Sequence, residues 1–437
     1  MTQAQSATPG KKLAILVAGG PAPGINGVIG AATIHACLSN VEVVGIQDGF
    51  QWLMAGDTAH TAPLTIADTS RIHFRGGSHL GISRANPTQS QALLDRTVAS
   101  LAELGIGMLI TVGGDDTAFT AYKLAQASKG SLAVVHVPKT IDNDLDLPSD
   151  VNTFGYQTAR HVGVEIVHNL MVDAKTTSRW YFVVAMGRKA GHLALGIGKA
   201  AGATLTLIPE EYAGGRARLE VIVDTLVGSI LKRLADGRQD GVAVLAEGLV
   251  EIVPAEDVAA VANVERDAHD HIRLSEINFG DIVKKAATQR LAGLHLKSTI
   301  VAKNIGYELR CADPIPLDME YTRDLGYCAA RFILDGGSNA LVSIQEGRFK
   351  PIPLPSIMDP STGRMRVRMV DVQSDRYKIA RSYMLRLRPE DLGDPRELDK
   401  LARVSGVSPE KFKETFGYLT EDEPAPMRLQ GSRPPTS

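Results

Sequence analysis

Two short polar segments, Gly113 to Asp116 and Pro138 to Asp144, carry most of the chemistry-bearing residues of this chain. Asp115, Asp142 and Asp144 would repel a polyphosphate unless a divalent cation lay between them, so they predict Mg²⁺ held largely through waters. One of the three is instead a candidate general base. Glycines bring backbone N–H groups close to a phosphate, and the start of a following helix adds partial positive charge. These residue types therefore favour a phosphate-rich ligand.

Each polar segment follows a strand-like apolar run, Met108 to Val112 in one case and Leu132 to Val137 in the other. In an α/β sheet this order puts both segments at the carboxyl edge of the strands, where ligands bind. Acidic, glycine-rich segments are also common turns, and a single Gly-Gly-Asp segment is more often a turn than a site. Two such segments in adjacent β-α units favour a phosphate site.

A third segment of this kind lies near the start of the chain. Lys12 to Val17 is an apolar strand candidate, and it leads into a glycine-rich loop over Gly19 to Asn26 and then a helix-like run to about Leu38. This loop is either a phosphate cradle or a tight turn. Its glycine spacing is not the dinucleotide fingerprint GxGxxG, so we do not expect a redox cofactor.

The segment from Arg75 to Arg84 combines glycines, hydroxyl groups and two arginines. The planar fork of arginine suits phosphate oxygens, so this segment is a candidate lid over a transferred group. The alternative is a solvated basic loop.

Strand-like and helix-like segments alternate through most of the chain, which predicts parallel, doubly wound sheets. We therefore expect an α/β fold with two Rossmann-like, doubly wound parallel-sheet lobes and a C-terminal extension. The first lobe is expected over residues 11–178 and the second over 179–350, with the chain free to cross between them. The extension is expected over 351–419, and the polar ends, 1–10 and 420–437, are predicted to be disordered.

Bulk composition excludes several classes of protein. The 437 residues have a formal net charge of −2, so no global field recruits nucleic acid or an anionic membrane. No apolar run approaches transmembrane length, and the first ten residues are not signal-like. Three cysteines without CxxC spacing (Cys37, Cys311 and Cys328) argue against a disulfide framework or a zinc site and fit a cytoplasmic protein.

Together, Gly113 to Asp116, Pro138 to Asp144 and Met186 to Arg188 resemble the phosphofructokinase family, specifically its pyrophosphate-dependent members. The resemblance runs from about Leu13 to about Ile344 and includes several separated motifs in the family's order. It implies the phosphofructokinase fold and a reversible, Mg²⁺-dependent phosphoryl transfer. The donor would be pyrophosphate and the acceptor the 1-hydroxyl of fructose 6-phosphate, giving fructose 1,6-bisphosphate and phosphate.

The resemblance also implies roles for single residues. The family residue at the position of Asp142 takes the proton from the attacking sugar hydroxyl, and Thr140 matches the reacting end of the sugar phosphate. Asp115 and Asp144 match positions associated with Mg²⁺. The implied catalytic set is Asp142, Thr140, Arg188 and Lys139.

The donor-binding positions implied by the family are Gly19, Arg84, Gly114, Asp116 and Lys139. ATP-using relatives have glycines where this chain has Asp116 and Lys139. An Asp carboxylate there would occupy space that an α-phosphate and ribose need, with added charge repulsion. A Lys would supply a point charge for a compact anion such as pyrophosphate, and it could pair with the Asp. The alternative is that Asp116 only caps the next helix and Lys139 faces solvent.

The sugar-phosphate positions implied by the family lie mostly later in the chain. An arginine at the place of Arg179 reaches across a subunit interface in the family, so we expect a homodimer or homotetramer. Another family arginine falls on Val301 here, and Lys303 or Lys297 is a candidate to replace it. The full implied set is Thr140, Asp142, Arg179, Met186, Gly187, Arg188, Glu247, Lys303, Tyr307 and Arg310.

Gly30 and Ile34 stand where allosteric bacterial members carry arginines for effector phosphates. Neither residue can hold an anion, so we predict no nucleotide or phosphoenolpyruvate control of that type. Three alternatives remain for the function: an ATP-dependent enzyme with the same fold, the same chemistry on sedoheptulose 7-phosphate, and a non-catalytic regulatory subunit. The last is disfavoured by the intact residues Asp115, Asp142, Asp144 and Arg188.

Overall fold

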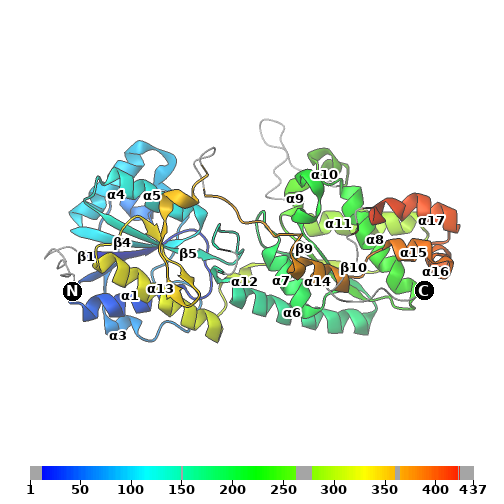
Figure 1. The fold of residues 1–437 in the computed structure, drawn as a ribbon, viewed down its shortest axis with the longest axis horizontal. Coiled ribbons are helices and arrows are strands. Elements are labelled where there is room, and N and C mark those ends of the chain that lie inside the picture. The colour runs from blue at the N-terminus through cyan, green and yellow to red at the C-terminus, as the bar shows by residue number, and fades with distance from the viewer. Residues whose placement is uncertain (1–11, 149–150, 262–277, 360–364, 422, 424–437) are drawn as a thin grey trace. The chain divides into compact units, whose positions relative to one another are not determined.

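The structure is a computed structural model that describes residues 12–148, 151–261, 278–359, 365–421 and 423. The chain forms two compact units (Figure 1), the first from Met1–Val162 and Tyr307–Arg368 and the second from Gly163–Gly306 and Met369–Ser437. The expected boundary between residues 178 and 179 differs from the observed one, which falls inside helix α6 (Tyr156–Thr177). The crossing lies at Gly163 within one continuous helix, and a single glycine inside a helical pattern does not by itself mark a domain boundary.

The first unit contains an eight-stranded sheet in the order β14-β11-β5-β4-β1-β2-β3, with β6 paired to β5. The edge strands β3 and β14 are antiparallel to their neighbours, and the other strands pair in parallel. Strands β1, β4 and β5 are buried along almost their whole length, as expected of parallel strands covered on both faces. The strands are β1 (Lys12–Val17), β2 (Val43–Ile46), β3 (Thr61–Leu64), β4 (Ile106–Gly113), β5 (Ala133–Thr140), β6 (Phe154–Gly155), β11 (Ala340–Leu341) and β14 (Ile352–Pro353), and β12 (Ile344–Gln345) and β13 (Arg348–Phe349) form a separate hairpin.

Two long helices of this unit, α1 and α13, pack closely against each other. Their contact needs glycines, because a Cβ atom at Gly326 would lie 2.5 Å from the backbone oxygen of Val28, and one at Gly27 would overlap Thr322. The helices of the unit are α1 (Ile25–Leu38), α2 (Gln51–Ala55), α3 (Ile66–Thr69), α4 (Gln91–Glu103), α5 (Asp115–Ala127), α12 (Tyr307–Arg310) and α13 (Pro316–Leu334).

The second unit contains a four-stranded, fully parallel sheet in the order β10-β7-β9-β8. Its strands are β7 (Trp180–Ala185), β8 (Leu205–Leu207), β9 (Gly241–Ala246) and β10 (Ile300–Ile305). Its helices before the extension are α7 (His192–Ala201), α8 (Leu219–Ala235), α9 (Leu249–Ile252), α10 (Ala255–Val261) and α11 (Phe279–Gly293).

The expected C-terminal extension is present as a helical stretch, and its residues are divided between the two units. Its first part, to Arg368, belongs to the first unit, and the rest adds helices α14 (Asp375–Tyr383), α15 (Pro389–Gly393), α16 (Pro395–Ser405) and α17 (Pro409–Phe416) to the second. Side chains of these helices, such as Leu398 and Phe412, are part of the second unit's hydrophobic core.

The prediction of disorder from residue 420 is wrong for its first residues. Thr420 ends a short 3-10 helix, and the Glu423 carboxylate pairs with Arg381 at 2.6 Å. This buried ion pair could not be found from the sequence, because its partners are 42 residues apart. The predicted disorder of residues 1–10 and 424–437 lies outside the described residues.

Within the described part of the chain, no helix is both long and apolar enough to cross a membrane. The three cysteines are not linked by disulfides.

Candidate functional site

Three loops of the first unit leave the same edge of its sheet, because β5, β4 and β1 are parallel neighbours. At the end of β1, Gly19 has a φ of 89°, a conformation that favours glycine, and its N–H donates to the Ser83 carbonyl at 3.0 Å. A Cβ atom at Gly19 would lie 3.8 Å from Lys139 Nζ and 3.9 Å from Thr117 Oγ1. The structure therefore brings the glycine-rich loop, the Gly-Gly-Asp-Asp segment and the segment after β5 together.

The sequence left open that Lys139 faces solvent and that Asp116 only caps the next helix. The structure differs from this alternative at both residues. Lys139 is only 4% exposed, and its ammonium group donates to the Gly20 carbonyl, so it does not face solvent. Helix α5 has Gly114 as its N-cap, and the exposed Asp116 stands with Asp115 in the first turn rather than at the cap. Acidic residues in this turn are favoured by the helix dipole.

The segment after β5 is a tight, largely buried turn. Asp142 and Asp144 are each 7% exposed, and Asn143 between them has a φ of 56°. The Thr140 hydroxyl accepts a hydrogen bond from the Asp142 N–H at 3.0 Å, and the Thr153 hydroxyl donates to the Thr140 carbonyl at 2.7 Å. These bonds fix the backbone on which the predicted base stands.

His136 supports this edge of the sheet and was missed by the sequence analysis. It is fully buried on β5, and burial lowers its pKa to about 3, so its ring is neutral near pH 7. Its Nε2 lies 3.1 Å from the Gly113 carbonyl, which can only accept, so Nε2 carries the proton and Nδ1 accepts from the Thr111 hydroxyl at 2.9 Å. In the sequence, His136 is indicated only as a single polar residue inside an apolar strand.

The loop from Arg75 to Arg84 is tied to the first unit at both ends. The buried Asn26 donates to the Arg75 carbonyl at 3.0 Å and accepts from the His79 N–H at 2.8 Å. Near the other end, Ser83 bridges to Ala18 beside β1. Arg84 itself is exposed, as a ligand-binding lid residue or a solvated one would be.

Arg310 of α12 lies next to the glycine-rich loop of the first unit. Its Nη1 is 3.7 Å from the position that a Cβ atom of Gly20 would occupy. Its guanidinium also covers the ring of Tyr307, which is 72% exposed, with 4.5 Å between Cζ and the ring centroid. A cation held on an aromatic face at this loop is suited to an anionic ligand.

In the second unit, the predicted sugar residues Met186 to Arg188 follow β7, and Glu247 follows the neighbouring strand β9. The Glu247 carboxylate accepts hydrogen bonds from the N–H groups of Gly187 at 3.1 Å and Arg188 at 3.2 Å. Arg188 has a φ of 49°, which is strained for a residue with a side chain. Glu247 therefore holds the backbone that presents Arg188.

Arg179 lies apart from this group within its unit. It precedes β7, whose six residues separate it from Met186 by about 20 Å. Its Nε is 3.8 Å from the Asp173 carboxylate. Lys303 lies within β10, opposite Val183, and Val301 lies opposite Tyr181. The structure thus unites Met186 to Arg188 with Glu247 but leaves Arg179 at the other end of the strand.

A magnesium site made of protein groups alone is not found among the described residues, which contain no cluster of three or more His, Cys, Asp or Glu side chains arranged around a common point. Mg²⁺ commonly keeps several waters and binds one or two carboxylates together with substrate phosphates. Asp115, at the start of α5 after β4, and Asp144, after β5, follow adjacent strands. They fit a cation that arrives with phosphate ligands.

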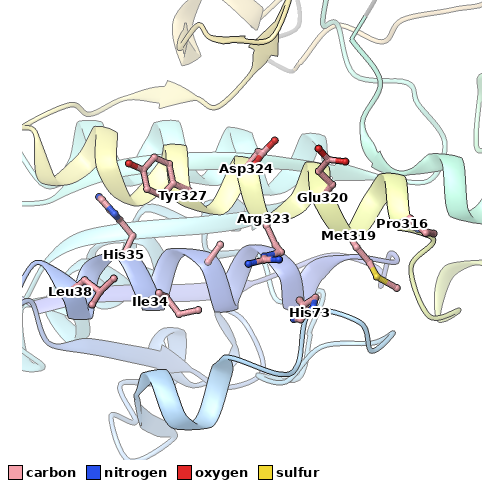
Figure 2. A pocket seen from close by; sticks show the side chains of 11 residues that line it. Ile34, His35, Leu38, His73, Pro316, Met319, Glu320, Arg323, Asp324 and Tyr327 are labelled. Atoms are coloured by element: carbon pink, nitrogen blue, oxygen red, sulfur yellow. The ribbon is translucent and has the colours of Figure 1, made fainter.

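A separate pocket of about 580 Å³ lies along α1 and α13 of the first unit (Figure 2). Ile34 lines it together with both signs of charge, including Arg323, Glu320 and Asp324. Gly30 has no room for a side chain, since a Cβ atom there would lie 2.8 Å from the Thr69 carbonyl oxygen. The pocket therefore has no concentration of positive charge from the first helix.

Comparison with known proteins gives concordant matches. The family model described as Phosphofructokinase matches residues 12–333. The pyrophosphate–fructose 6-phosphate 1-phosphotransferase of Thermotoga maritima is 52% identical over 416 residues, which cover 94% of this chain and 99% of the relative. The enzyme of the same name from Naegleria fowleri is 47% identical over 418 residues, covering 94% and 96%.

The fold is also similar to a crystal structure of pyrophosphate-dependent phosphofructokinase from Nitrosospira multiformis. The TM-score is 0.64 at 16% identity, and the match covers 97% of this chain and 95% of the other. The predicted α/β fold with two parallel-sheet lobes is confirmed.

Proposed function

Because the chain belongs to the phosphofructokinase family, we propose that it transfers a phosphoryl group from pyrophosphate to the 1-hydroxyl of fructose 6-phosphate. The observation that carries the choice of donor is the buried Lys139, whose ammonium group reaches the glycine-rich loop at Gly20. A compact cation there suits a bare diphosphate, and the exposed carboxylate of Asp116 disfavours the extra phosphate and ribose of ATP. Pyrophosphate and the product ester have similar transfer potential, so the reaction runs in both directions.

The proposed mechanism follows from the turn after β5. Asp142 accepts the proton of the 1-hydroxyl as the sugar oxygen attacks the nearer phosphorus of pyrophosphate. A new P–O bond to the sugar forms, the bridging P–O bond of the donor breaks, and phosphate leaves. Positioning and charge neutralisation supply most of the catalysis in such transfers. In the proposal Lys139, Arg84 and Arg188 neutralise the phosphates, while Gly19 and Gly114 allow close approach of the backbone.

Asp115 and Asp144 would hold Mg²⁺, an ion that commonly binds one or two carboxylates together with waters and substrate phosphates. The ion, when bound, would neutralise charge that develops on the transferred group.

The residues assigned to the sugar phosphate are those that match the family's motifs. Thr140 and Asp142 would hold its reacting end, and Met186, Gly187 and Arg188 would line the sugar, with Glu247 accepting from a sugar hydroxyl. Tyr307 and Arg310 are assigned to the sugar and its distal phosphate. Lys303 or Lys297 would replace the family arginine that falls on Val301.

Arg179 is assigned to the site of a neighbouring subunit, in a homodimer or homotetramer. Its distance along β7 from Met186 supports this assignment, because it cannot join that group in its own unit. The protein would then be inactive as a monomer.

We also propose that the enzyme lacks effector control through the first helix. Gly30 and Ile34 provide no cation there, and Gly30 leaves no room for one. Adding ADP or phosphoenolpyruvate should change the rate by less than the roughly fivefold effect of a weak allosteric coupling.

A donor and acceptor panel on the purified protein tests the proposal. Fructose 1,6-bisphosphate formation is measured with pyrophosphate and with ATP, and the reverse reaction with phosphate. We expect high kcat/KM with pyrophosphate and reversal with phosphate. Preference for ATP would identify an ATP-dependent enzyme, and higher kcat/KM with sedoheptulose 7-phosphate would change the acceptor. No turnover with any pair would indicate a regulatory protein.

A further inference from the structure

Arg368 holds the turn that carries the proposed base, although it lies outside residues 12–333, which the family model matches. Its Nε and Nη2 donate to the Asn143 carbonyl at 3.2 and 3.1 Å, and Nη2 also donates to Asn143 Oδ1 at 2.6 Å. Its Nη1 is shared among the carbonyls of Leu147 at 3.3 Å, Pro148 at 3.1 Å and Val151 at 2.9 Å. One guanidinium thus binds four backbone carbonyls and one side-chain amide.

The backbone around Arg368 adds to this contact. Its N–H donates to the Asp144 carbonyl at 2.7 Å, and the preceding Val367 forms an antiparallel bridge with Leu145. The chain near Arg368 therefore runs beside the turn like a short extra strand. All of these residues belong to the first unit.

The residues held by Arg368 lie directly next to the proposed base. Asn143 follows Asp142 and has a φ of 56°. Its side chain is also fixed on the other side, since Oδ1 accepts from the Thr153 N–H at 3.0 Å and Nδ2 donates to Asn152 Oδ1 at 3.1 Å. A left-handed residue is unfavourable without such support, so the turn depends on its partners.

We propose that Arg368 is a positioning residue for phosphoryl transfer: it fixes the turn over Asp142 to Asp144 so that the base and the metal-binding carboxylate keep their places. The inference rests on the proposed function of Asp142. Arg368 is not assigned to a substrate phosphate, because the N–H bonds of its guanidinium are directed at oxygens of the turn.

Arginine is the side chain that this set of surrounding carbonyl groups requires. Five N–H bonds in one plane can reach acceptors on several sides, whereas the ammonium of lysine is a compact charge with three donors. Burial lowers the pKa of Arg368 from its ordinary value, and Asp144 and Asp146 oppose that shift, so the group stays charged. Replacement by lysine would keep the charge but lose the hydrogen bonds that the guanidinium makes in several directions.

The test compares Arg368→Met, Arg368→Lys and Arg366→Met with wild-type protein. Arg366 is a matched control two residues away, because it pairs with the partly exposed Asp146 at 2.6 Å and with the Ser356 carbonyl rather than with the turn. Each protein is assayed for kcat and for KM of both substrates with pyrophosphate as donor. Hydrogen exchange of peptides covering residues 140–148 is measured without substrate.

We expect Arg368→Met to lower kcat about 10- to 100-fold, as small misplacements of catalytic groups do, with KM values changed much less. Hydrogen exchange of the turn should rise, and Arg368→Lys should restore little. Arg366→Met should resemble wild type. If Arg368→Met does not fold, Arg368→Lys is judged by the same criteria.

Three kinetic results would overturn the proposal. They are an unchanged kcat in the folded variant, a loss confined to the KM for pyrophosphate, and full recovery by lysine. Unchanged hydrogen exchange of the turn would do so as well. An inactive wild-type protein would refute the proposed function instead, and the exchange data would still decide whether Arg368 holds the turn.

Discussion

The ammonium group of Lys139 donates to the backbone carbonyl of Gly20, 119 residues earlier in the chain. This bond links the end of β5 to the glycine-rich loop after β1, and both Lys139 and Gly19 of that loop are assigned to the phosphoryl donor. Lys139 is almost fully buried, so its charge is directed into the donor loops rather than into solvent. The position of one lysine is therefore the basis for the proposed preference for pyrophosphate.

Replacing Lys139 by glycine should weaken pyrophosphate binding. Losing one charge-assisted contact of about 1.5–3 kcal/mol raises the KM for pyrophosphate roughly 10- to 100-fold. In the double variant Asp116→Gly/Lys139→Gly, the ratio of kcat/KM for ATP to that for pyrophosphate should rise at least about tenfold, because the repelling carboxylate is also gone. Steady-state rates with both donors measure the two effects.

Lys129→Gly is the matched control, because Lys129 is an exposed lysine of the first unit with a φ of 48°, which glycine accepts readily. Its kinetic constants should equal those of wild type. A Lys139→Gly variant with an unchanged KM for pyrophosphate would contradict the assignment of Lys139 to the donor.

The loops that carry Lys139, Asp142 and Gly19 could be predicted from the sequence, because parallel strands with polar ends place their loops at one edge. The residues that support those loops could not. His136 is a single polar residue in an apolar run, and Arg368 is a basic residue that resembles a solvated surface charge. Both act through contacts with segments distant in the chain, 23 positions away for His136 and more than 200 for Arg368.

The organisation of the units was also only partly predictable. Alternating apolar and polar segments indicated two sheets, and two sheets are present. The crossing inside α6 is marked only by Gly163, which a helix can also contain without a boundary. Helices α16 and α17 join the second unit through apolar side chains that could equally cover a separate domain. Which surface an amphipathic helix covers is decided by tertiary packing, which one sequence does not specify.

Asp142→Asn should lower kcat by about 10² to 10⁴-fold, the usual contribution of a general base, because the amide cannot accept the proton of the sugar hydroxyl. The KM values should change little, since the amide is nearly isosteric. Asp146→Asn is the control two residues beyond this turn, as its partly exposed carboxylate pairs with Arg366. Equal kcat values for the two variants would exclude Asp142 as the base.

Arg179→Met should raise the KM for fructose 6-phosphate about 10- to 100-fold, through loss of a charged contact with its phosphate. If Arg179 acts in a neighbouring subunit, hybrids of Arg179→Met and Asp142→Asn subunits regain activity. One site of such a hybrid combines an intact Asp142 with an intact Arg179. Tagged subunits, co-expressed and purified as hybrids, provide the measurement.

Two outcomes would contradict this placement of Arg179. Hybrids no more active than the parent variants would put Arg179 in the site of its own subunit. A fully active monomer at low protein concentration would show that no neighbour is needed. Arg331→Met is a suitable control, because this exposed arginine pairs only weakly with Asp335 at 3.7 Å.

His136 makes the stability of the first unit sensitive to acid. Burial lowers the pKa of its imidazole in the folded protein to about 3, whereas a histidine in an unfolded chain titrates near 6.5. Below pH 6.5 the unfolded chain therefore binds a proton that the folded protein does not, and stability falls as the pH falls. The contribution is present above the unfolded pKa and is lost progressively down to the folded pKa.

Between pH 7 and pH 5, His136 should reduce the free energy of unfolding of wild-type protein by about 2 kcal/mol. His136→Gln keeps a donor for the Gly113 carbonyl but does not titrate, so its free energy of unfolding should depend less on pH by about that amount. Urea titrations followed by tryptophan fluorescence at both pH values measure the difference, and Trp52 in the first unit provides a local probe. His168→Gln, which changes an exposed histidine, should retain the wild-type pH dependence. If the free energy of unfolding of His136→Gln and of wild type falls by the same amount on acidification, His136 is protonated in the folded protein. Its ring then does not act as a neutral donor to the Gly113 carbonyl.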